Sequence, residues 1–236
     1  MRSTAVAALS LVSASLFAVG AAPGGSPAAP LPARMADTGG GRQLITAVAP
    51  EAGSTSGTVT WWSRRDGQWV KAGAATARFG ANGLVEGDTR RQGTDTTPTG
   101  LYDLPYAFGI KRAPTGTTYR YRAVRQNSWW CQDNDSRSYN HWGEPRPADC
   151  RAAQSERLIS YPTQYAYGFV IGFNYADPVR GRGAGIFLHV DGRGATAGCV
   201  SVPAEAMRRL LRWAEPGKRP HLAIGTRGGR TAVTRY

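Results

Sequence analysis

The sequence predicts a mainly β fold with one packed helix near the C-terminus. Apolar and polar residues alternate over many short stretches, and glycine-rich turns separate these stretches. Only the segment that follows Pro203 has clear helical spacing. These observations favour a single β domain that packs against one helix.

Short strands with glycine-rich turns are predicted first, and the dipeptides Asp66-Gly67 and Asn82-Gly83 are hairpin signals. Aromatic and basic residues alternate over 118–125, as in a half-exposed strand. The predicted strands are residues 43–49, 57–64, 68–73, 75–80, 118–125, 156–162, 165–174, 184–190 and 221–226. The apolar stretches 156–162, 165–174 and 184–190 are expected to be central.

The predicted helix begins at Pro203, a residue favoured in the first turn. Met207, Leu210, Leu211 and Trp213 then fall on one face, and Pro216-Gly217 ends the helix. This face is expected to pack against the sheet.

Residues 1–22 have the three-part pattern of a secretory signal peptide: a basic start, a short apolar run and small residues. An uncleaved anchor is the alternative, and no other stretch is apolar enough for a membrane span. Residues 23–42 are rich in Pro, Gly and Ala and are expected to be a disordered linker. Residues 43–236 have the length of one domain.

The formal net charge is +13, which favours polyanionic partners. An anionic cell wall suits an exported protein better than nucleic acid, so no nucleic-acid partner is expected. A simply solvated basic surface remains an alternative. Tryptophans are numerous, and core packing is a more economical interpretation of them than a ligand-stacking surface.

Three cysteines in an exported chain leave one without a partner. Cys131 and Cys150 bracket a polar segment with few aliphatic residues, which cannot build its own core. A disulfide between them would add about 3 kcal/mol by constraining the unfolded chain. We therefore expect Cys131–Cys150 to be paired and Cys199 to be a free, functional thiol.

His189 and Cys199 lie ten residues apart in the stretch from Gly185 to Pro203. In a strand, Phe187 and His189 would share one face and Ile186 and Leu188 the other. A hairpin-like return through the intervening glycines could bring the imidazole near the thiol. The alternative is a core histidine beside a buried cysteine.

A nearby histidine can lower the pKa of a cysteine and deliver a proton to a leaving amine. Gly198 has no side chain, so a substrate carbonyl could approach the backbone N–H groups around Cys199 as an oxyanion hole. Asp191 follows His189 closely, but adjacent strand residues face opposite ways. A backbone carbonyl is therefore expected to orient the His189 ring. His141 and His221 are expected to be structural or exposed, and no metal site is expected.

Two blocks of sequence resemble the L,D-transpeptidase catalytic domain (YkuD) family. One is His189 followed by Thr196-Ala197-Gly198-Cys199-Val200, which matches the family's strand histidine and its Ser/Thr-x-Gly-Cys-Ile/Val segment. The other, 93–104, resembles the family's Thr-Pro-Thr-Gly block. The resemblance spans about 55–226 and implies a YkuD-like β-sandwich with one packed C-terminal helix. It also implies Cys199 as nucleophile and His189 as proton donor and acceptor.

Three positions depart from the family pattern: Val190 stands where many members have Gly, Ala197 where many have His, and Ser201 where Arg is usual. The chain resembles a divergent, actinobacterial-type branch. Arg182 or Arg193 could replace the missing charge, and together with Thr196 they are the expected substrate-binding residues.

The resemblance implies action on peptidoglycan stem peptides through a cysteine thioester, forming 3–3 cross-links without a cofactor. One alternative is an L,D-carboxypeptidase or endopeptidase that hydrolyses the same peptides. Another is a non-catalytic wall-binding module, degenerate at Ala197 and Ser201. We expect a secreted, wall-associated monomer.

Overall fold

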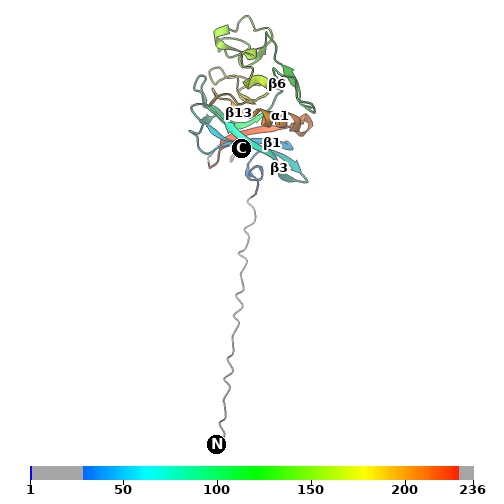
Figure 1. The fold of residues 1–236 in the computed structure, drawn as a ribbon. Helices are drawn as coiled ribbons and strands as arrows, with labels where there is room; N and C mark the ends of the chain where they lie inside the picture. The colour runs from blue at the N-terminus through cyan, green and yellow to red at the C-terminus, as the bar shows by residue number, and fades with distance from the viewer. Residues whose placement is uncertain (2–28, 229–236) are drawn as a thin grey trace.

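The computed structural model describes Met1 and residues 29–228. The expected signal peptide, apart from Met1, and the first part of the expected linker lie outside the described residues. Within the described residues, no helix is long and apolar enough to span a membrane. Figure 1 shows the domain as a curled sheet with α1 (Ala204–Trp213) beside it and a group of shorter segments above.

The main sheet has eleven strands in the order β4-β5-β14-β1-β2-β3-β13-β12-β11-β6-β7. Its strands are β1 (Gln43–Ala49), β2 (Ser56–Arg65), β3 (Gln68–Arg78), β4 (Leu84–Glu86), β5 (Thr97–Asp103), β6 (Ala107–Gly109), β7 (Tyr121–Ala123), β11 (Gly168–Val170), β12 (Phe187–Val190), β13 (Val200–Val202) and β14 (His221–Thr226). The small sheet has the order β10-β8-β9, with β8 (Trp129–Cys131), β9 (Trp142–Gly143) and β10 (Ser155–Arg157). The mainly β class is confirmed.

The hairpin predicted at Asp66-Gly67 joins β2 to β3. Both residues have positive φ, 47° and 79°, as a type I′ turn requires. Two other expectations are wrong. The strands predicted at 68–73 and 75–80 are one continuous strand, β3, which ends at Arg78. The turn at Asn82-Gly83 closes no hairpin, because β4 pairs in parallel with β5.

The predicted helix is confirmed as α1, with Pro203 at the position just before its first residue. Its buried face consists of Ala206, Met207, Leu210 and Leu211. Burying each of the larger side chains contributes about 1.5–3 kcal/mol. These side chains share one hydrophobic cluster with Leu188 and Val190 of β12, so the helix supports the strand that carries His189.

Three of the longer predicted strands are much shorter in the structure. Only Tyr121–Ala123 of 118–125 is a strand, β7 at the edge of the sheet, and only Gly168–Val170 of 165–174. Residues 156–162 are not a central strand: β10 lies in the small sheet, and the chain then turns through the 3₁₀ helix Leu158–Ser160. Pro162, which has no N–H to donate to a sheet, follows this turn.

A disulfide joins Cys131 of β8 to Cys150, as the cysteine count led us to expect; their Cα atoms are 6.1 Å apart. Inside the closed segment, the fully buried Asp133 accepts hydrogen bonds from the backbone N and Nε of Arg151, at 2.9 and 2.7 Å. The small sheet and the Asp133–Arg151 ion pair thus stabilise the segment 131–150, which has few aliphatic residues.

The expected linker spans 23–42, and its second half packs against the domain. Leu31–Arg34 form a 3₁₀ helix with Pro32 buried. Arg42 donates its backbone N–H to Lys218 O at 2.7 Å, and Arg219 Nη2 donates to Gly39 O at 3.1 Å. These contacts give the segment backbone partners, which a disordered linker does not have.

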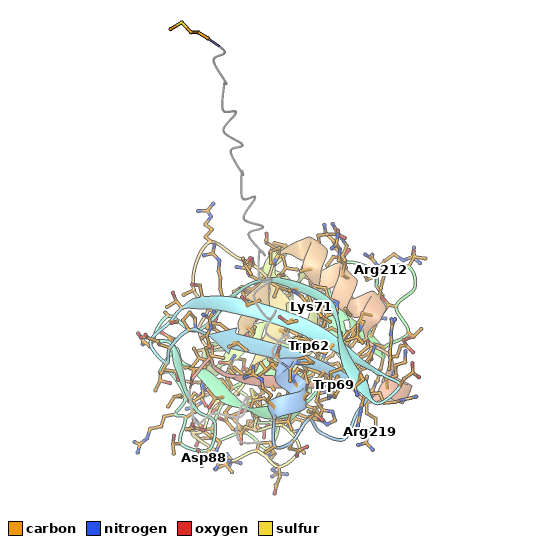
Figure 2. All side chains as sticks on the ribbon, turned by 90° about the horizontal axis from the view of Figure 1, so that it is seen from below. Trp62, Trp69, Lys71, Asp88, Arg212 and Arg219 are labelled. Carbon is orange, nitrogen blue, oxygen red and sulfur yellow. A yellow bond between two sulfur atoms is a disulfide. The ribbon has the colours of Figure 1, made fainter. Side chains whose placement is uncertain are left out.

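The six tryptophans outside α1 are dispersed. Trp61 and Trp130 are buried in the core, which agrees with the packing interpretation. Trp62 and Trp69 lie on the β2–β3 side of the domain, near Lys71 (Figure 2). Trp129 and Trp142 belong to the small sheet, so the six residues form no continuous surface.

Candidate active site

β12 carries His189, and β13 begins directly after Cys199; the two strands pair in parallel rather than as a hairpin. His189 is in register with Ser201, and Cys199 comes directly before β13. The expected hairpin-like return is therefore wrong. The connecting loop crosses to the next strand and is held by Thr196, whose N–H donates to Phe79 O at 2.8 Å.

The two faces of β12 are divided as predicted. Leu188 and Val190 belong to the cluster that contains the buried face of α1. On the other face, Phe187 packs in a second, aromatic cluster together with Cys199. The His189 ring contacts the edge of Tyr165, with 5.6 Å between ring centroids.

Cys199 is the free cysteine, and its residue surface is 8% exposed. Its Sγ accepts a hydrogen bond from Phe187 N–H at 3.3 Å and donates one to Gly185 O at 3.4 Å. Burial and then the Glu156 carboxylate raise the pKa of the thiol to about 12, while Phe187 N–H and Arg90 act in the opposite direction. Contrary to our expectation of a lowered pKa, the thiol is neutral at rest.

His189 is also buried, and its Nδ1 lies 2.8 Å from Val190 O. A carbonyl oxygen only accepts, so Nδ1 carries the proton and Nε2 remains basic. The expected backbone partner is thus confirmed, and Asp191 instead accepts from Ser201 Oγ at 2.7 Å. Burial lowers the pKa of His189, which keeps the ring neutral and able to take a proton.

His189 and Cys199 both line a cavity of about 480 Å³, within the range of small-ligand sites. In the described part of the chain, no hydrogen bond joins the two side chains. Arg193 lies exposed at the rim of the cavity, whereas Arg182 does not line it. His141 and His221 do not line it either. Among residues 29–228, no group of three or more His, Cys, Asp or Glu side chains could hold a metal ion.

The loop before Cys199 is closed by its own polar groups. Thr196 Oγ1 donates to Cys199 O at 2.7 Å and accepts from Gly198 N–H at 3.1 Å. In this conformation, the Gly198 N–H expected to face an oxyanion has a loop partner, and the Thr196 hydroxyl shapes the turn. Gly198 has φ +128°, and a Cβ there would lie 2.8 Å from both Thr96 O and Arg90 Nη2.

The second sequence block packs directly against this loop. Thr97, the first residue of β5, donates its hydroxyl to Cys199 O at 3.3 Å and accepts from Gly80 N–H at 2.8 Å. Two motifs separated by about a hundred residues therefore meet at the candidate nucleophile.

Arg90 and Glu156 are among the charged residues of the cavity that sequence reasoning missed. Glu156 accepts hydrogen bonds from Tyr165 Oη at 2.5 Å and from Gln132 Nε2 at 3.2 Å. Burial raises its pKa to about 7. One signal was available in the sequence: Glu156 is the single acidic residue of 156–162, a stretch that was otherwise predicted to be a central strand. Arg90 stands in a polar loop without periodicity, where no local signal marks it.

Comparisons with known proteins identify one family. The family model for the L,D-transpeptidase catalytic domain (YkuD) matches residues 54–222. Among curated proteins, none matches the sequence. A solved structure, that of Bdellovibrio bacteriovorus Bd1075, is similar at 19% identity and a TM-score of 0.38. The match covers 78% of this chain and 48% of the other, so it spans about half of that structure. Because the family model covers most of the chain, this protein belongs to the L,D-transpeptidase catalytic domain family.

Proposed function

We propose that this protein is an exported, cysteine-dependent L,D-transpeptidase that acts on peptidoglycan stem peptides. The observation that carries the proposal is the free Cys199 in one cavity with His189, whose Nε2 is available as a base. The disulfide is compatible with an extracytoplasmic location. The basic net charge of the chain suits an anionic wall.

In the first half-reaction, His189 Nε2 takes the Cys199 proton as Sγ attacks the carbonyl at the L-centre of a stem tetrapeptide. The bond to the terminal D-alanine breaks, His189 returns the proton to the leaving amine, and a thioester remains. In the second, the side-chain amine of another stem attacks the thioester and gives a 3–3 cross-link. The acceptor's proton passes through His189 and restores the thiol.

Neutral resting states of both residues suit this sequence. A thiol whose pKa is about 12 is not ionised at neutral pH, so its proton leaves as the attack begins. A histidine whose pKa is lowered is ready to accept that proton. The pair is thus arranged for general-base catalysis rather than for a permanent thiolate–imidazolium pair.

The test is intact-protein mass after mixing the mature enzyme with a stem tetrapeptide, with Cys199→Ala as the control. The expected result is a tripeptidyl adduct and free D-alanine with the wild type only. Peptide dimers in the same tube support transfer, and free tripeptide alone identifies an L,D-carboxypeptidase. Unreacted tetrapeptide and identical masses for both proteins, with a wall fragment as well, would contradict catalysis and favour a wall-binding module.

His189→Gln tests the base. The ring nitrogen that takes the Cys199 proton is lost, so adduct formation should fall by about 10²- to 10⁴-fold. Single-turnover adduct formation measured by mass checks this. Adduct formation at the wild-type rate would show that another group takes the proton.

A further inference from the structure

Arg90 is a buried cation on the wall of the cavity that contains Cys199. It lies in the loop between β4 and β5 and is 5% exposed. Its Nε donates to Thr96 O at 2.7 Å and its Nη1 donates to Arg182 O at 3.2 Å. The guanidinium also lies over the Phe173 ring, 5.7 Å from the centroid. Three separate segments thus fix the position of the charge.

Arg90 forms no ion pair with an acidic side chain of the described residues, although the Asp95 carboxylate, which also lines the cavity, interacts with it favourably. None of the ion pairs among residues 29–228 includes it, and its Nη2 makes no hydrogen bond with a described residue. Burying a cation without a directly paired anion is unfavourable. An anion that forms during the reaction would recover part of this cost.

Nη2 lies against the residue that precedes the nucleophile, because a Cβ on Gly198 would be only 2.8 Å from it. Thr96, which holds Nε, is followed by Thr97, whose hydroxyl donates to Cys199 O. Arg90, the Thr-Pro-Thr-Gly block and the Cys199 loop therefore form one hydrogen-bonded unit.

We propose that the positive charge of Arg90 stabilises the thiolate of Cys199 as it forms. The thiol proton moves to His189 Nε2, the sulfur becomes negative, and Arg90 stays protonated throughout. The role rests on Cys199 being the nucleophile but not on which peptide it attacks.

Among the charged groups around Cys199, Arg90 is the buried cation that can stabilise the thiolate. Glu156 of β10 opposes the thiolate, and His189 and Tyr165 face the same space. Asp95 and Arg193 also line the cavity, but Arg193 is exposed to solvent, which screens its charge. Arg182, the other expected substitute for the missing family arginine, contributes its carbonyl to holding Arg90.

The test is the pH dependence of Cys199 alkylation by iodoacetamide, followed by mass on the full chain with its disulfide intact. Arg90→Gln keeps an N–H donor for Thr96 O but loses the charge. It should lower the rate about tenfold at a fixed pH and move the profile to higher pH, since one pKa unit is a tenfold change in thiolate fraction. Arg90→Lys keeps the charge and should stay near the wild-type profile.

Arg91→Gln is the matched control, because Arg91 is the neighbouring, exposed arginine of the same loop. Its profile should equal that of the wild type. An unshifted profile for a folded Arg90→Gln, or equal shifts for Arg90→Gln and Arg90→Lys, would overturn the proposal. If Arg90→Gln does not fold, a shifted profile for Arg90→Lys overturns it. The assay uses no stem peptide, so its failure is distinct from failure of the proposed transpeptidase reaction.

Discussion

The two hydrophobic clusters of the protein meet at β12 but have different compositions. The cluster that includes the buried face of α1 also holds Leu188 and Val190. The second cluster is dominated by aromatic rings, among them Trp130 and Phe187, and it contains Cys199. One strand thus presents its aliphatic face to the main core and its reactive face to the cavity. We therefore expect that stability and thiol reactivity can be changed separately.

Leu210→Ala should have the largest effect on stability, on the main-core side. Leu210 is fully buried, and truncating such a side chain costs about 2–5 kcal/mol. Urea unfolding measures this loss. The alkylation profile of Cys199 in the folded variant should match that of the wild type, and a shifted profile would show that the two clusters are coupled.

The double variant Cys131→Ala, Cys150→Ala comes next and acts on the cavity side. Loss of the cross-link should cost about 3 kcal/mol. β10 lines the cavity and pairs with β8, which carries Cys131. Hydrogen exchange should therefore accelerate in β8 and β10 more than in β1 or β14. Adduct formation from a stem tetrapeptide should also slow, because the part of the cavity lined by Gln132 and Glu156 loses its cross-link. A uniform rise in exchange over the whole domain would contradict this separation.

Glu156→Gln should have the smallest effect, which depends on pH. Burial raises the pKa of Glu156 to about 7, above its value in the unfolded chain, so the folded state binds this proton more tightly. The protonated Glu156 therefore contributes to the stability of the folded state, and this contribution is lost as pH rises from about 4.5 to 7. Relative to the wild type, the variant should gain stability across this window in urea unfolding.

The same variant should alkylate Cys199 several-fold faster at pH 8, because the carboxylate that raises the thiol pKa is gone. This change is opposite in sign to that expected for Arg90→Gln. Equal rates for Glu156→Gln and wild type would mean that the carboxylate does not act on the thiol.

Local patterns in the sequence were sufficient to predict one group of structural features. The Asp66-Gly67 turn, the apolar face of α1 and the shared face of Phe187 and His189 on β12 depend on near neighbours in the chain. The limits of β1 and β14 were predicted for the same reason.

Other features depend on contacts between distant segments, which no local period encodes. The parallel pairing of β12 with β13 is set by the surrounding sheet. Arg90 is buried because Thr96 and the more distant Arg182 and Gly198 close around it. Glu156 faces the cavity because the disulfide segment folds as a separate small sheet. The free Cys199 and its place beside the strand of His189 were therefore predictable from sequence, but the electrostatic surroundings of the thiol were not.

The odd number of cysteines has a consequence for oxidative folding. In a compartment where disulfides form, a third thiol can mispair with Cys131 or Cys150 or attack their finished bond. Only a thiolate does this efficiently, and the burial of Cys199 keeps it protonated. If Cys199 is the nucleophile proposed above, the burial that makes its attack depend on a base also protects the thiol from oxidation until a substrate enters.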